Sequence, residues 1–294
     1  MPRLTDLWRS AIVPLPMAEL LTRGTLEGIA PSWLPQDRDF TFLADPFGLW
    51  RGPRLHVFVE RFDYRDRHGV IEVLTYDAQM QLLTRHTCLH EPWHLSYPFV
   101  FEAEGETWML PEAHRSGRLT LYRACEFPQR WEPAAVIAEV GAAVDATPVF
   151  HQGLWWLLYC LPSSKAAKVS ALHLAFAERL SGPWRRHPGN PVRIDRASAR
   201  PGGTPLRCGD ALVAPMQDCT HTYGGAISPL HIARMDPQRF EADAAPPIVA
   251  PMQFAPYLDG LHTLAACGDV TLVDCKRIDR SLRGLAIDLR RWLG

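Results

Sequence analysis

The chain has 294 residues, and its 31 Lys and Arg against 32 Asp and Glu give a formal net charge of −1. This balance excludes the basic field with which proteins collect nucleic acid or anionic membranes. No apolar run reaches the about 18 residues of a membrane span. Prolines and charges interrupt the N-terminal segment MPRLTDLWRSAIVPLPMAELL before a secretory core forms. We therefore expect no membrane span, no nucleic-acid partner and a cytoplasmic location.

The cysteine and proline content indicates the structural class of the protein. The seven cysteines form an odd set with no CxxC pair, which argues against a disulfide framework and a zinc ribbon. Most stand between apolar residues, so buried free thiols in a reducing compartment are expected. The 26 prolines favour short elements joined by many turns over long helices.

In chain order, a helix of about two turns is expected in PMAELLTR, residues 16–23, and five similar hairpins follow. Each hairpin is an apolar strand, a Gly-containing turn and a second apolar strand. The hairpins are ADPFGLWRGPRLHVFVERF from Ala44, SYPFVFEAEGETWMLPEA from Ser96, VDATPVFHQGLWWLLYC from Val144, RPGGTPLRCGDALVAPMQDC from Arg200 and LDGLHTLAACGDVTLVDCKR from Leu258. The last segment, RSLRGLAIDLRRWL, fits a helix or a strand with a basic tail.

The repeat distance decides the fold. With Asp45, Tyr97, Asp145, Pro201 and Leu261 as markers, successive hairpins are 52, 48, 56 and 60 residues apart. Further strand candidates between them, such as GVIEVLTYD and GRLTLYRAC, give each unit about four strands. We predict an all-β fold, a single domain over residues 1–294 that forms a five-bladed β-propeller with four-stranded blades around a central axial pocket. A β-sandwich has no reason to repeat at this distance, and a β-helix repeats at a much shorter one.

Inner strands of a propeller converge at one end of the axis, so hairpin starts are candidate site positions. Asp45, Tyr97, Asp145, Arg200 and His262 are therefore expected around one axial cavity. Glycoside hydrolysis needs one carboxylic acid and one carboxylate. Asp45 is the candidate base or nucleophile, and Glu112 or Asp145 is the candidate acid. The alternative for both Asp residues is that they cap turns.

Glu60 and Glu112 end apolar strands, where an unpaired charge is costly. Arg200 and Lys276 are the expected partners, and a structural ion pair at a blade edge is the alternative to a substrate contact. Other polar and aromatic residues near the hairpin starts suit sugar hydroxyls and sugar rings. The substrate-binding candidates are Glu60, His94, Ser96, Tyr97, Arg200, Gln217, Asp218, Tyr223 and His262. Asp218 fits a turn equally well.

Several motifs, taken in order, carry a family resemblance. ADPF, HLSYPFVFE, LPEA, LYRACEFPQRW, VDATPVF, RPGG, QDCTHTYGGAI and LHTL resemble the propeller region at the N-terminus of plant glucosamine inositolphosphorylceramide transferases and its stand-alone bacterial relatives. The similarity runs from DLWRSAIVP to LVDCKR. In the plant proteins a separate glycosyltransferase domain is assigned the transfer chemistry. The resemblance therefore implies a glycan-recognition module of glycolipid or polysaccharide biosynthesis, with a glycosyltransferase as partner.

A more distant likeness points to enzymes. GPWRRHPGNPV, residues 182–192, resembles a segment of five-bladed glycosidases of the arabinanase, xylosidase and fructosidase type. That likeness implies an Asp base in the first blade, an Asp that tunes pKa in the second and a Glu acid in the third. Here Asp45 matches the first, Tyr97 stands at the second and Asp145 at the third. No His spacing predicts a metal ligand set, although the likeness leaves open a cation near His262.

Overall fold

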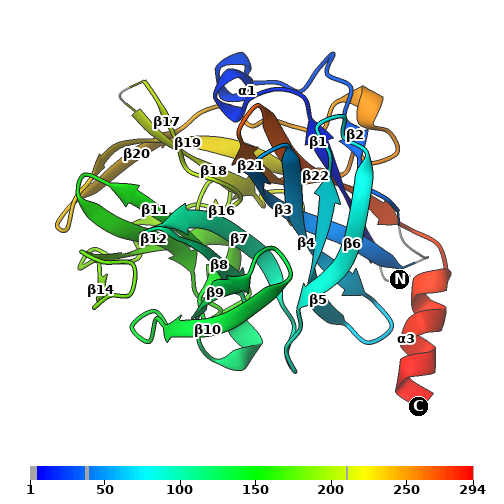
Figure 1. Ribbon diagram of the computed structural model, residues 1–294, viewed down its shortest axis with the longest axis horizontal. Helices are drawn as coiled ribbons and strands as arrows, with labels where there is room; N and C mark the ends of the chain where they lie inside the picture. Colours follow the sequence, from blue (N-terminus) through cyan, green and yellow to red (C-terminus); the bar gives the residue numbers. More distant parts are fainter. Residues whose placement is uncertain (1–4, 37–39, 210, 294) are drawn as a thin grey trace.

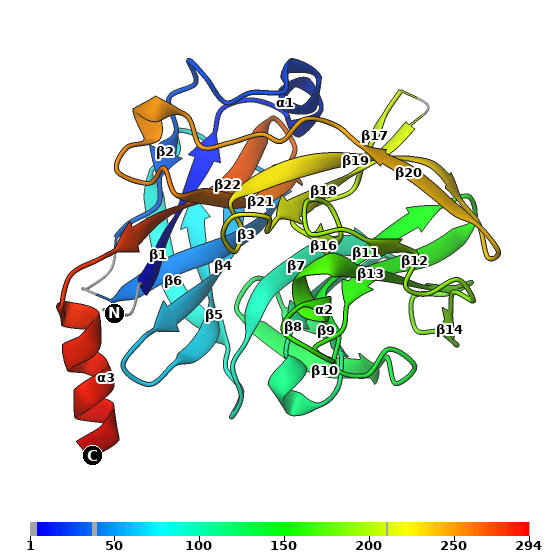
Figure 2. The ribbon, with the colours of Figure 1, turned by 180° about the vertical axis from the view of Figure 1, so that it is seen from behind.

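The computed structural model describes residues 5–36, 40–209 and 211–293. Five twisted blades surround a central axis (Figures 1 and 2), as the repeat predicted, and their strands pair antiparallel within each blade. Blade 1 comprises β3 (Thr41–Arg51), β4 (Arg54–Asp63), β5 (His68–Tyr76) and β6 (Leu82–Leu89). Blade 2 comprises β7 (Ser96–Ala103), β8 (Glu106–Glu112), β9 (Thr120–Glu126) and β10 (Arg130–Val136). Blade 3 comprises β11 (Val144–His151), β12 (Leu154–Cys160), β13 (Ala171–Ala177) and β14 (Arg185–Arg186), with β15 (Arg193–Ile194) beside β13.

The remaining two blades are built less regularly. Blade 4 comprises β16 (Arg200–Pro201), β18 (Ala211–Asp218), β19 (Ala226–Met235) and β20 (Phe240–Ala244), with β17 (Leu206–Cys208) beside β18. Blade 5 comprises β21 (Gly260–Cys267), β22 (Val270–Asp279), β1 (Thr5–Val13) and β2 (Ser32–Trp33). The N-terminal strand β1 thus completes the C-terminal blade, since it pairs with β22 from Thr5↔Asp279 to Val13↔Thr271. A parallel bridge between Arg9 and Leu43 joins blade 5 to blade 1.

Helices are few and short. The expected N-terminal helix is α1 (Met17–Arg23), and the last segment adopts the helical alternative as α3 (Arg283–Leu293), which projects from the ring (Figures 1 and 2). Between β12 and β13 lies α2 (Ala167–Ser170). Two 3-10 turns occupy His114–Ser116 and Met252–Phe254. None of the helices in the described ranges is long and apolar enough to cross a membrane.

The hydrophobic core is distributed between neighbouring blades. One cluster joins blades 1, 2 and 5 around Phe47, Phe58 and Tyr97, and others lie between blades 2 and 3, 3 and 4, and 4 and 5. Full burial of a Phe or Leu side chain contributes about 1.5–3 kcal/mol, so each interface between blades is a substantial source of stability. This packing fixes the inner strands around the axis.

Candidate active site in the axial cavity

A bulge recurs where three inner strands begin. Asp45, Tyr97 and Asp145 have φ values of 49°, 46° and 48°, in the left-handed region that non-glycine residues rarely adopt. The pairing register shifts at each of them, between Ala44 and Phe47 in blade 1 and at the matching places of blades 2 and 3. A bulge redirects a side chain out of the strand's alternation, so these residues occupy structurally equivalent places, as the sequence repeat indicated.

The cavity at this end of the axis, called the axial cavity below, has a volume of about 440 Å³. Most of the candidate residues contribute to its wall. Those that line it are Asp45, Glu60, His94, Ser96, Glu112, Asp145, Arg200, Tyr223 and His262. Strand register explains why Glu60 and Glu112 are equivalent: each pairs with the residue just before a bulge, Ala44 or Ser96. The five hairpins therefore bring together residues that are more than 200 positions apart.

Three of the substrate-binding candidates are not among the residues that line the cavity. The Tyr97 ring is fully buried in the core, and its hydroxyl lies 2.9 Å from Thr147 Oγ1 and accepts the N–H of Gly203 at 2.8 Å. Gln217 is also fully buried. Asp218 adopts the turn alternative, since its Oδ1 accepts a backbone N–H two residues ahead. Tyr97 thus connects blades 2, 3 and 4 across the axis.

Other residues of the cavity wall were missed by the sequence analysis. Asp6 and Trp8 come from β1, Lys168 from α2, and His114 and Arg115 from the turn after β8. They lie outside the hairpin repeats, so the repeat pattern carried no signal for them. The Trp8 ring stacks on the His262 imidazole with 3.6 Å between centroids and 13° between planes.

Asp145 is held in a buried ion pair. Its Oδ2 accepts a hydrogen bond from Arg200 Nε at 2.7 Å and another from Gln217 Nε2 at 2.8 Å, and both charged side chains are 4% exposed. Burial by itself lowers the pKa of Arg200. The negative charge of Asp145 outweighs this effect and keeps the Arg200 pKa well above its ordinary value. Arg200 Nη2 also donates to the Tyr223 hydroxyl at 3.2 Å. Asp145 therefore holds Arg200 in place at the cavity wall.

Glu112 is held as an anion by its own turn. The backbone N–H of His114 donates to Glu112 Oε1 at 2.8 Å, and His114 Nδ1 lies 2.6 Å from the same oxygen. Burial by itself raises the pKa of Glu112, but the hydrogen bonds and charge of His114 outweigh it and lower the pKa to about 2. The Ser96 hydroxyl donates to the other carboxylate oxygen at 3.4 Å.

Glu60 has the opposite environment. Its nearest ionisable partner is His94, whose Nε2 lies 3.5 Å from Oε1. Burial raises the pKa of Glu60 well above its ordinary value, and the negative charges of Asp45 and Glu112 raise it further. Burial also lowers the pKa of His94 to about 4, so this histidine is neutral near pH 7. The surroundings of Glu60 therefore favour its protonated form, whereas those of Glu112 favour the anion.

The prediction that Arg200 and Lys276 pair with Glu60 and Glu112 is wrong. Arg200 pairs with Asp145 in the neighbouring blade. Lys276 Nζ donates to Thr222 Oγ1 at 2.9 Å and to the Tyr223 carbonyl at 2.5 Å, and it lies 3.5 Å from Asp6 Oδ2. The reason is the pairing of β1 with β22, which places Asp6 next to Lys276 and away from the glutamates.

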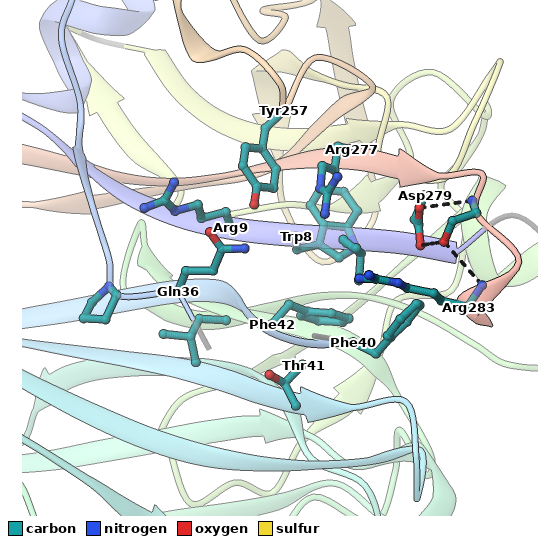
Figure 3. Close-up of a pocket in the computed structure, with 14 residues that line it drawn as sticks. Trp8, Arg9, Gln36, Phe40, Thr41, Phe42, Tyr257, Arg277, Asp279 and Arg283 are labelled. Carbon is teal, nitrogen blue, oxygen red and sulfur yellow. Dashed lines mark hydrogen bonds between the residues drawn. The ribbon is translucent and has the colours of Figure 1, made fainter. Parts of the chain in front are cut away.

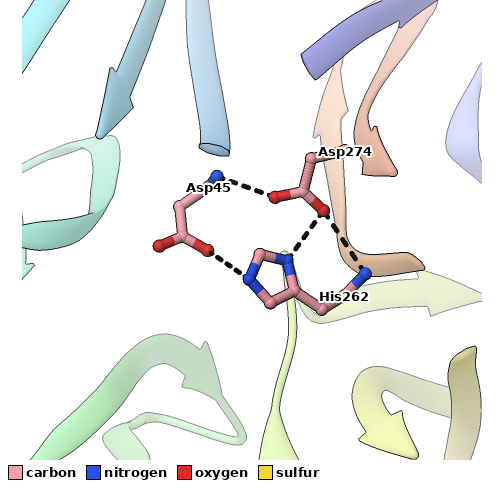
Figure 4. Close-up of side chains that lie close together, drawn as sticks. All are labelled: Asp45, His262 and Asp274. Atoms are coloured by element: carbon pink, nitrogen blue, oxygen red, sulfur yellow. Dashed lines mark hydrogen bonds and ion pairs between the residues drawn. The ribbon is translucent and has the colours of Figure 1, made fainter. Parts of the chain in front are cut away.

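Asp45, His262 and Asp274 form a third cluster (Figure 4). Asp274 Oδ2 accepts the N–H of Asp45 at 2.8 Å, while Oδ1 accepts that of Thr263 at 3.0 Å and lies 2.8 Å from His262 Nδ1. Asp45 Oδ2 in turn accepts the N–H of Tyr97 at 3.1 Å. Burial raises the pKa of Asp45 to about 7, against the attraction of His262. Asp45 can therefore change protonation state near neutral pH.

The same three residues offer ligand-type atoms within 4.8 Å of one another. Backbone N–H groups already occupy both oxygens of Asp274. His262 Nε2 and Asp45 Oδ1 lie 3.6 Å apart, and Asp45 Oδ1 also accepts a hydrogen bond from the Thr263 hydroxyl at 3.2 Å. Hydrogen bonds within the protein thus reach every carboxylate oxygen of this cluster, and the cation near His262 stays a prediction.

Sequence comparison identifies the family. Residues 32–251 match the model of the family described as "Glucosamine inositolphosphorylceramide transferase 1, N-terminal". The chain belongs to this family. Curated members named glucosamine inositolphosphorylceramide transferase 1 are 34% identical over 206 residues in Oryza sativa subsp. indica and 32% identical over 228 residues in Arabidopsis thaliana. These alignments cover 68% and 76% of the chain but only 27% and 29% of the plant proteins.

Solved structures of glycoside hydrolases share the fold of this family member. A family 117 glycoside hydrolase from Zobellia galactanivorans has a TM-score of 0.57 at 13% identity, covering 94% of this chain and 92% of that one. The Podospora anserina α-L-arabinofuranosidase PaAbf62A has a TM-score of 0.59 at 9% identity, with 84% and 94% coverage. A GH43_1 enzyme from Xanthomonas citri has a TM-score of 0.54 at 13% identity, with 88% and 92% coverage. The comparison confirms the predicted propeller.

Proposed function

We propose that this family member is a carbohydrate-active protein that binds a glycan, or the sugar head of a glycolipid, in the axial cavity and cleaves or transfers a glycosidic bond there. The observation that carries the proposal is the different environment of three neighbouring carboxyl groups: burial raises the pKa of Glu60 well above its ordinary value, His114 lowers that of Glu112 to about 2, and burial raises that of Asp45 to about 7. Carboxyl groups whose pKa values are driven apart are the usual basis of an acid–base pair.

Each group then has a role. Glu60 protonates the glycosidic oxygen as the bond from the sugar carbon to that oxygen breaks. Asp45, in its ionised form, accepts a proton from the water or sugar hydroxyl that attacks the same carbon. Glu112 keeps its negative charge and stabilises the positive charge that develops on the sugar ring. Asp145 is not the proton donor in this scheme, since its Oδ2 already accepts hydrogen bonds from Arg200 and Gln217.

The proposal is tested by screening chromogenic glycosides and a glycan array with the wild type, Glu60→Gln and the matched control Glu106→Gln, whose side chain is exposed. Loss of a general acid is expected to lower the rate by about 10²–10⁴-fold while sugar binding remains. Glu106→Gln should behave as the wild type. Cleavage that is undiminished in Glu60→Gln would exclude Glu60 as the proton donor.

A second function has its own support. The chain matches a family described by the N-terminal part of a transferase and aligns with less than a third of the plant proteins, which supports a role as a recognition module for a glycosyltransferase. Both oxygens of Asp45 also accept protein hydrogen bonds, from Tyr97 N–H and from the Thr263 hydroxyl at 3.2 Å, as expected of a structural carboxylate. Sugar that binds without ever being cleaved would favour this function. Absence of any sugar binding would refute both.

A further inference from the structure

A second cavity lies between blade 5 and blade 1, outside the axis (Figure 3). We call it the arginine pocket, since Arg9 of β1, Arg277 of β22 and Arg283 at the start of α3 line it, together with aromatic residues that include Tyr257. Its volume is about 180 Å³, the space of about six water molecules at about 30 Å³ each. It shares Trp8 and Phe42 with the axial cavity, so the two cavities are neighbours.

Strand pairing places two positive charges side by side. Arg9 pairs with Cys275 and Leu7 pairs with Arg277, so the two arginines are diagonal neighbours on one face of blade 5. Diagonal neighbours in a sheet are about 7–8 Å apart, a distance at which like charges repel. The Tyr257 ring lies between them, 5.9 Å from Arg9 Cζ and 6.0 Å from Arg277 Cζ (Figure 3).

Within the described parts of the chain, neither arginine forms an ion pair. The carboxylate of the pocket, Asp279, instead accepts hydrogen bonds from Ser281 N at 3.1 Å and Ser281 Oγ at 2.8 Å. Among the described residues, the charges of Arg9 and Arg277 therefore have no carboxylate partner, and an oxygen-rich anion in the pocket would supply one.

From these observations we propose that the arginine pocket binds a phosphate group, carried by a small ester of headgroup size. Guanidinium groups recognise phosphate through paired N–H donors, and two of them match its charge and its several oxygens. The aromatic wall excludes water from the charged contacts and thereby strengthens them. The volume leaves room beyond the phosphate for part of the group that it esterifies.

The phosphate can come from a soluble ester or from a phospholipid headgroup. The two sources are separated by titrating the whole chain with inorganic phosphate, with glycerol phosphate and with vesicles of phosphatidylglycerol in phosphatidylcholine, at constant ionic strength. Calorimetry and a co-sedimentation assay measure binding to the soluble and the vesicle ligands. Binding in the soluble arms identifies a soluble ester, and binding confined to the vesicles identifies a lipid headgroup; both support the pocket.

Substitutions of single arginines test whether phosphate binds in the arginine pocket. Arg277→Gln is expected to weaken phosphate binding by about tenfold or more, because a charge-assisted contact is lost. Arg9→Gln should do the same, and Arg239→Gln, at an exposed arginine of blade 4, should have no effect. Unchanged binding in both pocket variants, or no binding in any arm, would overturn the proposal. Sugar binding in the axial cavity is measured separately, so failure here leaves the proposed function standing.

Discussion

Glu112→Gln is the substitution whose effect on stability can be worked out most directly. In the folded chain the pKa of Glu112 is about 2, against an ordinary value of 4.5, because His114 stabilises the anion. A group with a depressed folded pKa adds stability above its unfolded pKa and loses it as the pH falls through the folded value. At 1.36 kcal/mol per pKa unit, the carboxylate contributes about 3 kcal/mol to the free energy of unfolding near pH 7.

Urea unfolding followed by tryptophan fluorescence measures this contribution. Glu112→Gln should lower the free energy of unfolding by about 3 kcal/mol at pH 5–7, and by less than half of that at pH 3, where the unfolded glutamate is already protonated. Glu106→Gln in the same strand, with an exposed side chain, is the control and should change stability by about 0.5 kcal/mol or less. Equal stability of Glu112→Gln and wild type at pH 7, or a difference that persists unchanged at pH 3, would refute the role given to His114.

Three further outcomes are expected. Arg200→Met should cost about 3–5 kcal/mol because Asp145 is left buried without its cation, and the double variant with Asp145→Asn should recover part of that loss; strictly additive losses in urea unfolding would contradict the ion pair. Tyr97→Phe should cost about 1–3 kcal/mol because the buried N–H of Gly203 loses its acceptor. Tyr76→Phe should be nearly neutral in the same assay, because the buried Tyr76 hydroxyl has no partner among the described residues. If Asp45 is the base, kcat/KM on a cleaved glycoside should rise with pH through about 7, and a flat profile from pH 5 to 8 would exclude it.

The sequence predicted the parts of the molecule that local patterns encode. Alternating apolar residues and Gly-containing turns define each hairpin, and the spacing of the hairpins defines the blades. Pairing between chain ends has no local signature, so the position of β1, and with it Trp8 in the cavity wall, could not be anticipated. The direction of the Tyr97 side chain could not be predicted either. It depends on a one-residue bulge in β7, and the strand register that creates this bulge forms only on folding.

Asp45, Asp145 and Asp274 fasten neighbouring blades to one another through their oxygens, whether or not any sugar is ever processed. A related chain that had lost its chemistry would still need these acids to close its ring. Conservation of these three Asp residues in an alignment would therefore say little about catalysis. Their replacement would destabilise the fold as well as impair any reaction. Among the described residues, no hydrogen bond links Glu60 to another blade. Glu60 therefore has no such structural role in closing the ring. Whether relatives keep a glutamate at this one place is the more informative sign of which family members are enzymes.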